Sequence, residues 1–162
     1  MFAEVAGTFA WTQGAITTAG WFDWLSRLPL ELRMTLPDGT QCLCVHARPG
    51  KDDGPGINKG LSNAEICAIL SDCEDHLVCV GHTHQPIDRK VGRCHIVNPG
   101  SISNPRAPIL EASYAILEAT NEGYHIEHRL ADYDREQIVL QLKALKHPGA
   151  AFIINHLRGL YK

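Results

Sequence analysis

The sequence predicts an α/β domain in which the connections between strands are mostly antiparallel. Residues 30–36 alternate strictly between apolar and polar side chains, as in a half-buried strand. Residues 77–81 form an uninterrupted apolar run, which is typical of a strand buried on both faces. Residues 17–28 carry apolar side chains at helical spacing. Along the chain we expect helix, hairpin, helix, strands and helices, with no internal repeat.

The predicted N-terminal helix covers residues 17–28. Thr17 or Thr18 is placed to cap its first turn, and Pro29 ends it because proline cannot continue a helix. One face of this helix would be apolar, made of Trp21, Trp24, Leu25 and Leu28.

A hairpin and a long loop are expected next. Asp38-Gly39 tolerates the positive φ of a tight turn, so the strand at 30–36 should pair with a return strand at 40–45. His46 then opens an irregular segment, residues 46–60, in which four glycines and two prolines predict a loop. Loops of this length are commonly functional or disordered.

Capping and turn residues predict the remaining elements. Ser62-Asn63-Ala64-Glu65 is a capping box for a short helix that ends near Leu70. A strand at 93–97 is closed by Asn98-Pro99-Gly100-Ser101. The last elements are a hairpin and two helices: strands 113–119 and 124–130, a helix capped by Asp132 or Asp134, and a short helix ending at Gly159.

Composition narrows the class of protein. The 162 residues suggest one domain, at roughly 150 residues per domain, and 44% hydrophobic with 20% charged residues is typical of a soluble globular protein. A net charge of −3 argues against a nucleic-acid binder with a basic face. No apolar run is long enough to span a membrane, and the N-terminus lacks the basic segment of a secretory signal. We therefore expect a cytoplasmic protein.

The cysteines point the same way. None of the six forms a C-x-x-C pair, so zinc-ribbon and thioredoxin interpretations have no support. We interpret them as reduced thiols that act as small buried hydrophobes, which fits a reducing compartment. They are Cys42, Cys44, Cys67, Cys73, Cys79 and Cys94.

Three histidines are the candidate metal ligands. His82 and His84 follow the buried strand at 77–81, and in an extended backbone residues two apart face the same way. His46 also ends an apolar strand. Ligand sites of α/β proteins gather outside the carboxyl ends of strands, so neighbouring strands would bring three imidazoles to one crevice. Pro86 prevents the strand from continuing past this point.

The other six histidines have no companion at ligand spacing. We expect them to form ordinary hydrogen bonds at strand ends or on surfaces, and the same explanation stays open for the first three. They are His76, His95, His125, His128, His147 and His156.

These residues resemble the calcineurin-like metallophosphoesterases, in particular a bacterial branch of small phosphodiesterase-like proteins. The resemblance covers nearly the whole chain. The family's V-H-G-x-P is similar to Val45-His46-Ala47-Arg48-Pro49, its G-H-T-H-x-P matches residues 81–86, and its N-P-G-S matches residues 98–101. It implies a mixed two-sheet β-sandwich flanked by helices, that is, an α+β sandwich.

The resemblance also implies chemistry. Two divalent metals, Mn, Fe or Zn, would sit in the crevice, with His46 and His82 on one and His84 on the other. Such a pair generates hydroxide and neutralises developing charge, so the implied function is hydrolysis of phosphomono- or phosphodiesters. Arg48 and Arg106 are weaker candidates for contacts with the substrate phosphate, since they are also explained as solvated loop residues.

The chain departs from the family at its start. None of the family's Asp-x-His, Gly-Asp and Gly-Asn-His motifs, which include the bridging carboxylate and the general acid histidine, occurs in residues 1–162. We expect residues 1–162 to be a single partial domain, the C-terminal two-thirds, without the first βαβ units. No catalytic residue is assigned.

Two alternatives stay open: a non-catalytic binding or scaffold protein, and a mononuclear zinc protein with three histidine ligands. The expected partners are a phosphorylated small molecule and no nucleic acid or membrane. Exposed sheet edges would favour a homo-oligomer.

Overall fold

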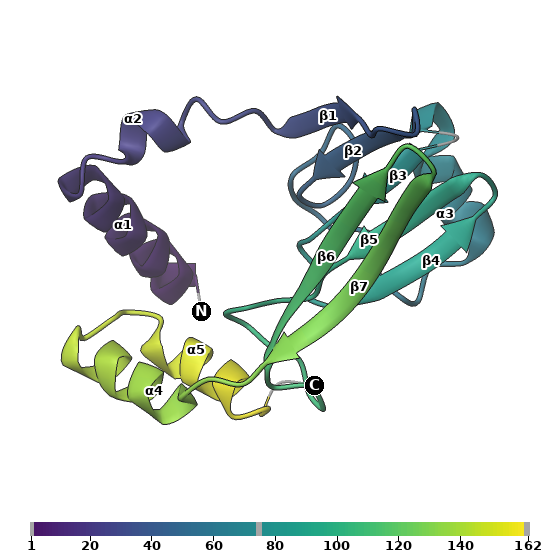
Figure 1. The fold of residues 1–162 in the computed structure, drawn as a ribbon. Coiled ribbons are helices and arrows are strands. Elements are labelled where there is room, and N and C mark those ends of the chain that lie inside the picture. Colours follow the sequence, from purple (N-terminus) through teal and green to yellow (C-terminus); the bar gives the residue numbers. More distant parts are fainter. Residues whose placement is uncertain (1, 74–75, 161–162) are drawn as a thin grey trace.

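The computed structural model describes residues 2–73 and 76–160 and contains two sheets with helices at their margins (Figure 1). The strands are β1 (Glu31–Thr35), β2 (Gln41–Val45), β3 (His76–Cys79), β4 (Ile87–Val91), β5 (Cys94–Asn98), β6 (Ala112–Thr120) and β7 (Gly123–Ala131). The helices are α1 (Phe2–Thr18), α2 (Phe22–Leu25), α3 (Asn63–Ile69), the 3₁₀ turn η1 (Ser71–Cys73), α4 (Arg135–Ala144) and α5 (Ala150–Leu157).

The larger sheet is mixed. Its strand order is β1-β2-β3-β5-β4, with β2, β3 and β5 parallel and the two edge strands antiparallel to their neighbours. The second sheet is the antiparallel hairpin β6–β7, which lies across one face of the first (Figure 1). This confirms the α/β class with two sheets and flanking helices, and it adds a parallel centre where mostly antiparallel connections were expected.

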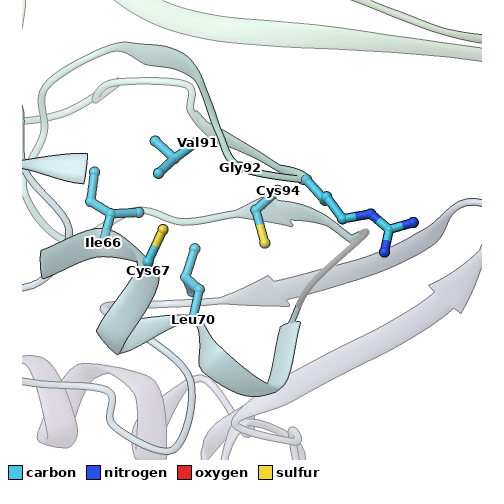
Figure 2. A pocket seen from close by; sticks show the side chains of 7 residues that line it. Ile66, Cys67, Leu70, Val91, Gly92 and Cys94 are labelled. Carbon is cyan, nitrogen blue, oxygen red and sulfur yellow. The ribbon is translucent and has the colours of Figure 1, made fainter. Parts of the chain in front are cut away.

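Helix α3 lies on the opposite face of the larger sheet and begins at the predicted capping box. The Ser62 side chain accepts a hydrogen bond from the Glu65 backbone N–H, and the Glu65 carboxylate accepts one from the Ser62 backbone at 2.8 Å. Beside α3 is a cavity of about 110 Å³ lined by Ile66, Cys67, Leu70, Val91, Gly92, Arg93 and Cys94 (Figure 2). It includes none of the candidate ligands, so we interpret it as a packing gap.

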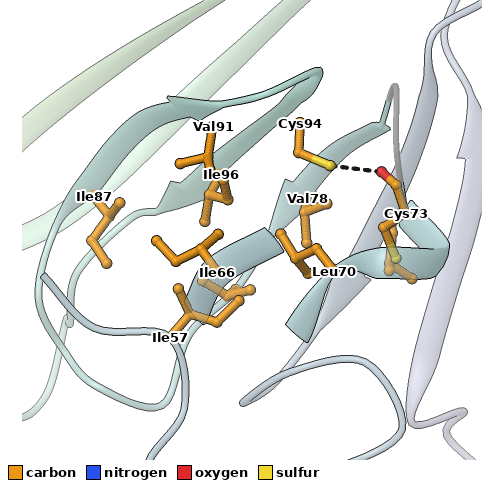
Figure 3. Close-up of a cluster of buried hydrophobic side chains, with 11 residues drawn as sticks. Ile57, Ile66, Leu70, Cys73, Val78, Ile87, Val91, Cys94 and Ile96 are labelled. Atoms are coloured by element: carbon orange, nitrogen blue, oxygen red, sulfur yellow. Dashed lines mark hydrogen bonds between the residues drawn. The ribbon is translucent and has the colours of Figure 1, made fainter. Parts of the chain in front are cut away.

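Two apolar layers stabilise the sandwich. The layer under α3 contains Leu43, Ile57, Ile66, Leu70, Cys73, Val78, Val80, Ile87, Val91, Cys94 and Ile96 (Figure 3). The layer under the hairpin contains Leu36, Cys42, Leu77 and Val97, packed against Ala115, Ala119, Tyr124 and Ile126. Side chains of β2 alternate between these layers, because successive residues of a strand face opposite sides.

The predicted helix at 17–28 is wrong. Helix α1 occupies residues 2–18, a turn follows at Gly20 with φ of +77°, and α2 has only four residues. The apolar residues that suggested one helical face are instead spread over a turn and remain exposed, with Trp21 at 59% and Trp24 at 56%.

Strand β4 was not expected. It begins at Ile87, directly after Pro86, and pairs with β5 across a tight turn at Gly92, where φ is +59°. Proline therefore ends the histidine turn here and does not prevent a new strand.

The interpretation of the cysteines holds in part. Cys42, Cys73 and Cys94 are buried, whereas Cys44 and Cys79 are half-buried and Cys67 is exposed on α3. All six are free thiols. No helix in the described ranges is both long and apolar enough to cross a membrane.

Candidate metal centre

His46 and His82 meet at the carboxyl edge of the larger sheet. Strands β2 and β3 are parallel neighbours with Cys44 opposite Cys79, so the chain leaves both strands at the same edge. The Gly81 N–H donates to the His46 carbonyl oxygen at 2.7 Å, and this hydrogen bond joins the segments that follow the two strands. The Nδ1 atom of His82 then lies 3.2 Å from the Nε2 atom of His46.

The tautomer of His82 is set by the loop that follows His46. Its Nε2 atom lies 2.7 Å from the carbonyl oxygen of Gly54, and because a carbonyl can only accept, Nε2 carries the proton. In the neutral ring, Nδ1 is therefore an acceptor with its lone pair toward His46. A metal-binding histidine commonly donates its other N–H to a backbone carbonyl in this way.

The loop approaches His82 closely enough to require glycine. A Cβ atom at Gly56 would lie 3.0 Å from Cδ2 of His82 and 3.1 Å from Cγ2 of Thr83, and φ at Gly56 is +59°. Glycine at position 56 therefore allows the loop backbone to pack against the side chains of His82 and Thr83.

The backbone at the histidines is a turn. His82 has φ of +62° and His84 has φ of +57°, while the Thr83 N–H donates to the Gly81 carbonyl oxygen at 2.6 Å. The expectation that an extended backbone aims both rings the same way is therefore wrong. A left-handed conformation costs a residue with a Cβ atom roughly 1–2 kcal/mol, and two such residues in one turn are typical of a functional site.

Asn98 holds this turn in place. It is fully buried, and its Nδ2 atom donates to the Gly81 carbonyl oxygen at 2.7 Å and to Thr83 Oγ1 at 3.1 Å. Its Oδ1 atom accepts from the Gly100 N–H at 2.9 Å. The N-P-G-S motif therefore acts as a positioning element for the histidine turn.

A second layer supports Asn98 from the hairpin. The Nε2 atom of His128 lies 2.9 Å from the Asn98 carbonyl oxygen, and Ser113 donates from Oγ to the Pro99 carbonyl oxygen at 2.6 Å. The sequence predicted an ordinary hydrogen bond for His128 and no contact for Ser113, because no local pattern in β6 or β7 specifies contact with a distant turn.

His84 lies apart from the other two rings. Burial, and then the charge of Arg106, lower the pKa of His84 below its usual range, with smaller contributions from His156 and His82. His84 is therefore favoured in the neutral form that can bind a metal. Among the described residues, the set of three potential ligand atoms that all lie within 4.8 Å of one another consists of cysteines and not of these histidines.

A cavity of about 450 Å³ opens beside His82. Its walls are Pro55, Asn58, Lys59, Gly60, His82, Thr83, Gln85 and Arg106. Arg106, a candidate phosphate contact, therefore shares a wall with His82, and Lys59 is a second cationic residue there that the sequence did not single out. Arg48 is not part of this wall; its backbone pairs with that of Lys51 in the loop.

Comparison with known proteins adds the following findings. Residues 5–122 match the family model for the calcineurin-like phosphoesterase superfamily domain. None of the curated proteins compared with the chain matches it.

Two solved structures have a similar fold. One is a hypothetical protein, PH1004, of Pyrococcus horikoshii OT3, with 22% identity and a TM-score of 0.73 over 85% of this chain and 53% of that one. The other is a metallophosphoesterase from Sphaerobacter thermophilus, with 21% identity and a TM-score of 0.69 over 87% of this chain and 61% of that one. The chain therefore spans little more than half the length of these structures.

Proposed function

We propose a function for this chain, which belongs to the calcineurin-like phosphoesterase superfamily. It supplies part of a two-metal site for hydrolysing phosphomono- or phosphodiesters. The residues we assign to metal binding are His46 and His82 on one cation and His84 on the other. Residues 1–162 would then be one partial domain of a cytoplasmic enzyme.

The spacing between the first two rings carries this proposal. Two nitrogens bound to one tetrahedral zinc ion at about 2.0–2.1 Å lie about 3.3 Å apart. Nδ1 of His82 and Nε2 of His46 are separated by 3.2 Å, and the Gly54 carbonyl leaves Nδ1 of His82 free to act as a ligand. In the structure this contact is a hydrogen bond, and because Nδ1 of His82 accepts, Nε2 of His46 donates. A cation shared by the two rings would take the place of that proton.

The division of the histidines between two cations is supported by the position of His84. Its ring does not join the other two in a set within 4.8 Å, as a mononuclear three-histidine site would require. A lowered pKa keeps it neutral, and Arg106 beside it repels a proton.

A two-metal site also needs carboxylate ligands, and the described residues do not place any beside His46 and His82. Within residues 2–73 and 76–160, no aspartate or glutamate joins His46 and His82 in such a set. Two divalent cations carry four positive charges, and neutral imidazoles compensate none of them. We therefore propose that the bridging carboxylate comes from a segment outside this chain, which fits its coverage of 53% and 61% of the two similar structures.

The substrate would lie in the cavity beside His82. When bound, the metal pair would supply an activated water and stabilise negative charge on the phosphoryl group. Arg106 and Lys59 line the same wall and would bind the non-reacting phosphate oxygens, because guanidinium and ammonium groups donate to oxyanions. A phosphorylated small molecule fits a cavity of this size.

Metal titration of single histidine variants tests the assignment. We expect His46→Ala and His82→Ala each to weaken binding of Mn²⁺ by ~100-fold or more in calorimetry, since losing a ligand costs at least as much as losing its support. His125→Ala, at an exposed position on β7, is the matched control and should bind as the unmodified chain does.

Three results would contradict the proposal. If the His46, His82 and His125 variants bound the metal with equal affinity, His46 and His82 would not be metal ligands. Binding of one zinc that depends equally on His46, His82 and His84 would favour the mononuclear alternative. Absence of hydrolysis of bis(p-nitrophenyl) phosphate by a longer version of the chain that carries the carboxylate motifs and binds two metals would favour a non-catalytic binding protein.

A further inference from the structure

Three cysteine sulfurs converge between the two sheets, and none of these residues belongs to the histidine site. Cys42 and Cys44 are two apart on β2 and so face the same layer, while Cys79 is the residue of β3 directly opposite Cys44. The three Sγ atoms all lie within 4.8 Å of one another. The sequence analysis saw no C-x-x-C pair and missed this set, because its third member comes from another strand.

The distances suit a single cation. Three thiolates bound to tetrahedral zinc at about 2.3 Å lie about 3.8 Å from one another. The Sγ atoms of Cys42 and Cys44 are 4.0 Å apart, and no two of the three sulfurs are more than 4.8 Å apart, so the set lies within about 1 Å of that spacing. Thiolate sulfur is a soft ligand that selects Zn²⁺, Cu⁺ and similar cations over Mg²⁺ or Ca²⁺.

The arrangement differs from that of cysteines that merely fill space. In the layer under α3, Cys94 donates from Sγ to the Cys73 carbonyl oxygen at 2.8 Å, which is ordinary structural behaviour (Figure 3). Cys42 and Cys44 instead form a hydrogen bond between their own sulfurs, and the sulfur of Cys79 lies within 4.8 Å of both. Three sulfurs that contact one another in this way are also at ligand spacing.

The three cysteines differ in burial. Cys42 is only 2% exposed, whereas Cys44 and Cys79 are half-buried. A tetrahedral ion bound by the three sulfurs would take a fourth ligand, such as a water molecule.

We propose that Cys42, Cys44 and Cys79 form a thiolate site for one thiophilic cation, with zinc as its ordinary occupant. The site is separate from the histidine pair and does not depend on the proposed hydrolysis. A bound ion would join β2 to β3 directly before the points where these strands deliver His46 and His82. It would therefore stabilise the frame of the histidine site without taking part in its chemistry.

Cobalt and cadmium report thiolate ligands directly. Under reducing conditions, the chain should develop a near-ultraviolet sulfur-to-metal charge-transfer band that saturates at one equivalent of Co²⁺ or Cd²⁺, a band that imidazole ligands do not give. Cys44→Ser and Cys79→Ser should each lower the affinity read from this band by ~100-fold or more. Cys67→Ser, at the exposed cysteine of α3, is the matched control and should leave the band unchanged.

A second pair of variants separates this proposal from the histidine site. The double variant His46→Ala/His82→Ala should keep the charge-transfer band, even if it abolishes binding of Mn²⁺. Far-ultraviolet circular dichroism identifies variants that fail to fold, and Cys79→Ala then replaces Cys79→Ser. The proposal is overturned if the folded, reduced chain gives no band, or if the Cys44 and Cys79 variants bind as tightly as the Cys67 variant.

Discussion

His82 Nδ1 and His46 Nε2 lie 3.2 Å apart although the two residues are 36 positions apart in the chain. Backbone contacts produce this approach: the parallel pairing of β2 with β3, and the hydrogen bond from Gly81 N–H to the His46 carbonyl oxygen. Neither depends on a flexible side chain. The sheet therefore fixes the backbone from which the two rings extend, and the rings are held by their mutual contact and by the Gly54 carbonyl oxygen.

Substitution of Gly56 should disturb His82 by contact. Gly56→Ala would place Cβ against His82 and Thr83, whereas Gly50→Ala puts the same methyl group into open space at a similar φ of +70°. Both variants pay the strain of positive φ, but we expect Gly56→Ala to lower the free energy of unfolding by about 1 kcal/mol more. Urea denaturation measures the difference, and equal values for the two variants would refute the contact.

Loss of the Asn98 side chain should loosen the whole turn. Asn98→Ala removes the side-chain donor to the Gly81 carbonyl oxygen, which keeps only the Thr83 N–H, and takes from the Gly100 N–H its acceptor, so we expect a cost of about 1–3 kcal/mol in unfolding free energy. Asn121→Ala, at an exposed turn between β6 and β7, should change it by less than ~0.5 kcal/mol. Calorimetric metal titration of the Asn98 variant should also show weaker binding, although Asn98 is not a ligand. Unaltered stability would show that the N-P-G-S motif does not position the turn.

Gly100 and Ser113 should be energetically coupled. A Cβ atom at Gly100 would lie 2.7 Å from Ser113 Oγ and 2.8 Å from Ser113 Cβ. Gly100→Ala should therefore be strongly destabilising alone and less so in a Ser113→Gly background, with a coupling energy of at least ~1 kcal/mol. A double-mutant cycle by denaturant unfolding measures this energy. Additive costs would mean that the chain relieves the overlap elsewhere.

The two candidate arginines should differ in phosphate binding. Arg106 lines the cavity beside His82 and Arg48 does not. In the metal-loaded chain, Arg106→Gln should weaken the binding of inorganic phosphate about tenfold or more, because a charge-assisted hydrogen bond is lost. Arg48→Gln should bind phosphate as the unmodified chain does. The reverse order in a calorimetric titration would move the phosphate site to the loop after His46.

His84 should make the metal-free chain sensitive to mild acid. Its pKa in the folded state is lowered from 6.5, chiefly by burial and by Arg106. Between that lowered value and 6.5, the unfolded chain takes up a proton that the folded chain does not. The free energy of unfolding therefore falls as pH drops below 6.5. His84→Gln should remove this pH dependence of the unfolding free energy, whereas His125→Gln, at an exposed site, should keep it. Denaturant unfolding below pH 6.5 measures the difference. The same pH dependence in both variants would contradict the prediction.

Local signals predicted some elements well. The alternating residues and the Asp38-Gly39 turn gave the β1–β2 hairpin, and the capping box gave α3, because these patterns encode the geometry within a few residues. The N-terminal helix failed for the same reason: Trp21 and Trp24 matched a helical spacing, but Gly20 interrupts the helix. The spacing of apolar residues does not reveal a turn that interrupts the helix, such as the one at Gly20.

For the candidate site, the sequence indicated which residues to compare but not how they are arranged. The sequence selected His46, His82 and His84, and the strand order then explained how the first two meet. It did not reveal the left-handed turn at His82 and His84, since neither residue type requires that conformation. The thiol set was missed because Cys79 joins the C-x-C pair across a strand pairing that no local pattern specifies.

The left-handed turn sets folding and binding against each other at the same two positions. Glycine adopts φ near +60° without the steric cost that histidine bears, so a library randomised at 82 and 84 and sorted for foldedness alone should drift toward glycine. Sorting the same library for cation retention should return imidazoles. The frequencies of glycine and histidine at positions 82 and 84 in the two pools would then measure how strongly selection for cation binding opposes the conformational strain of the turn.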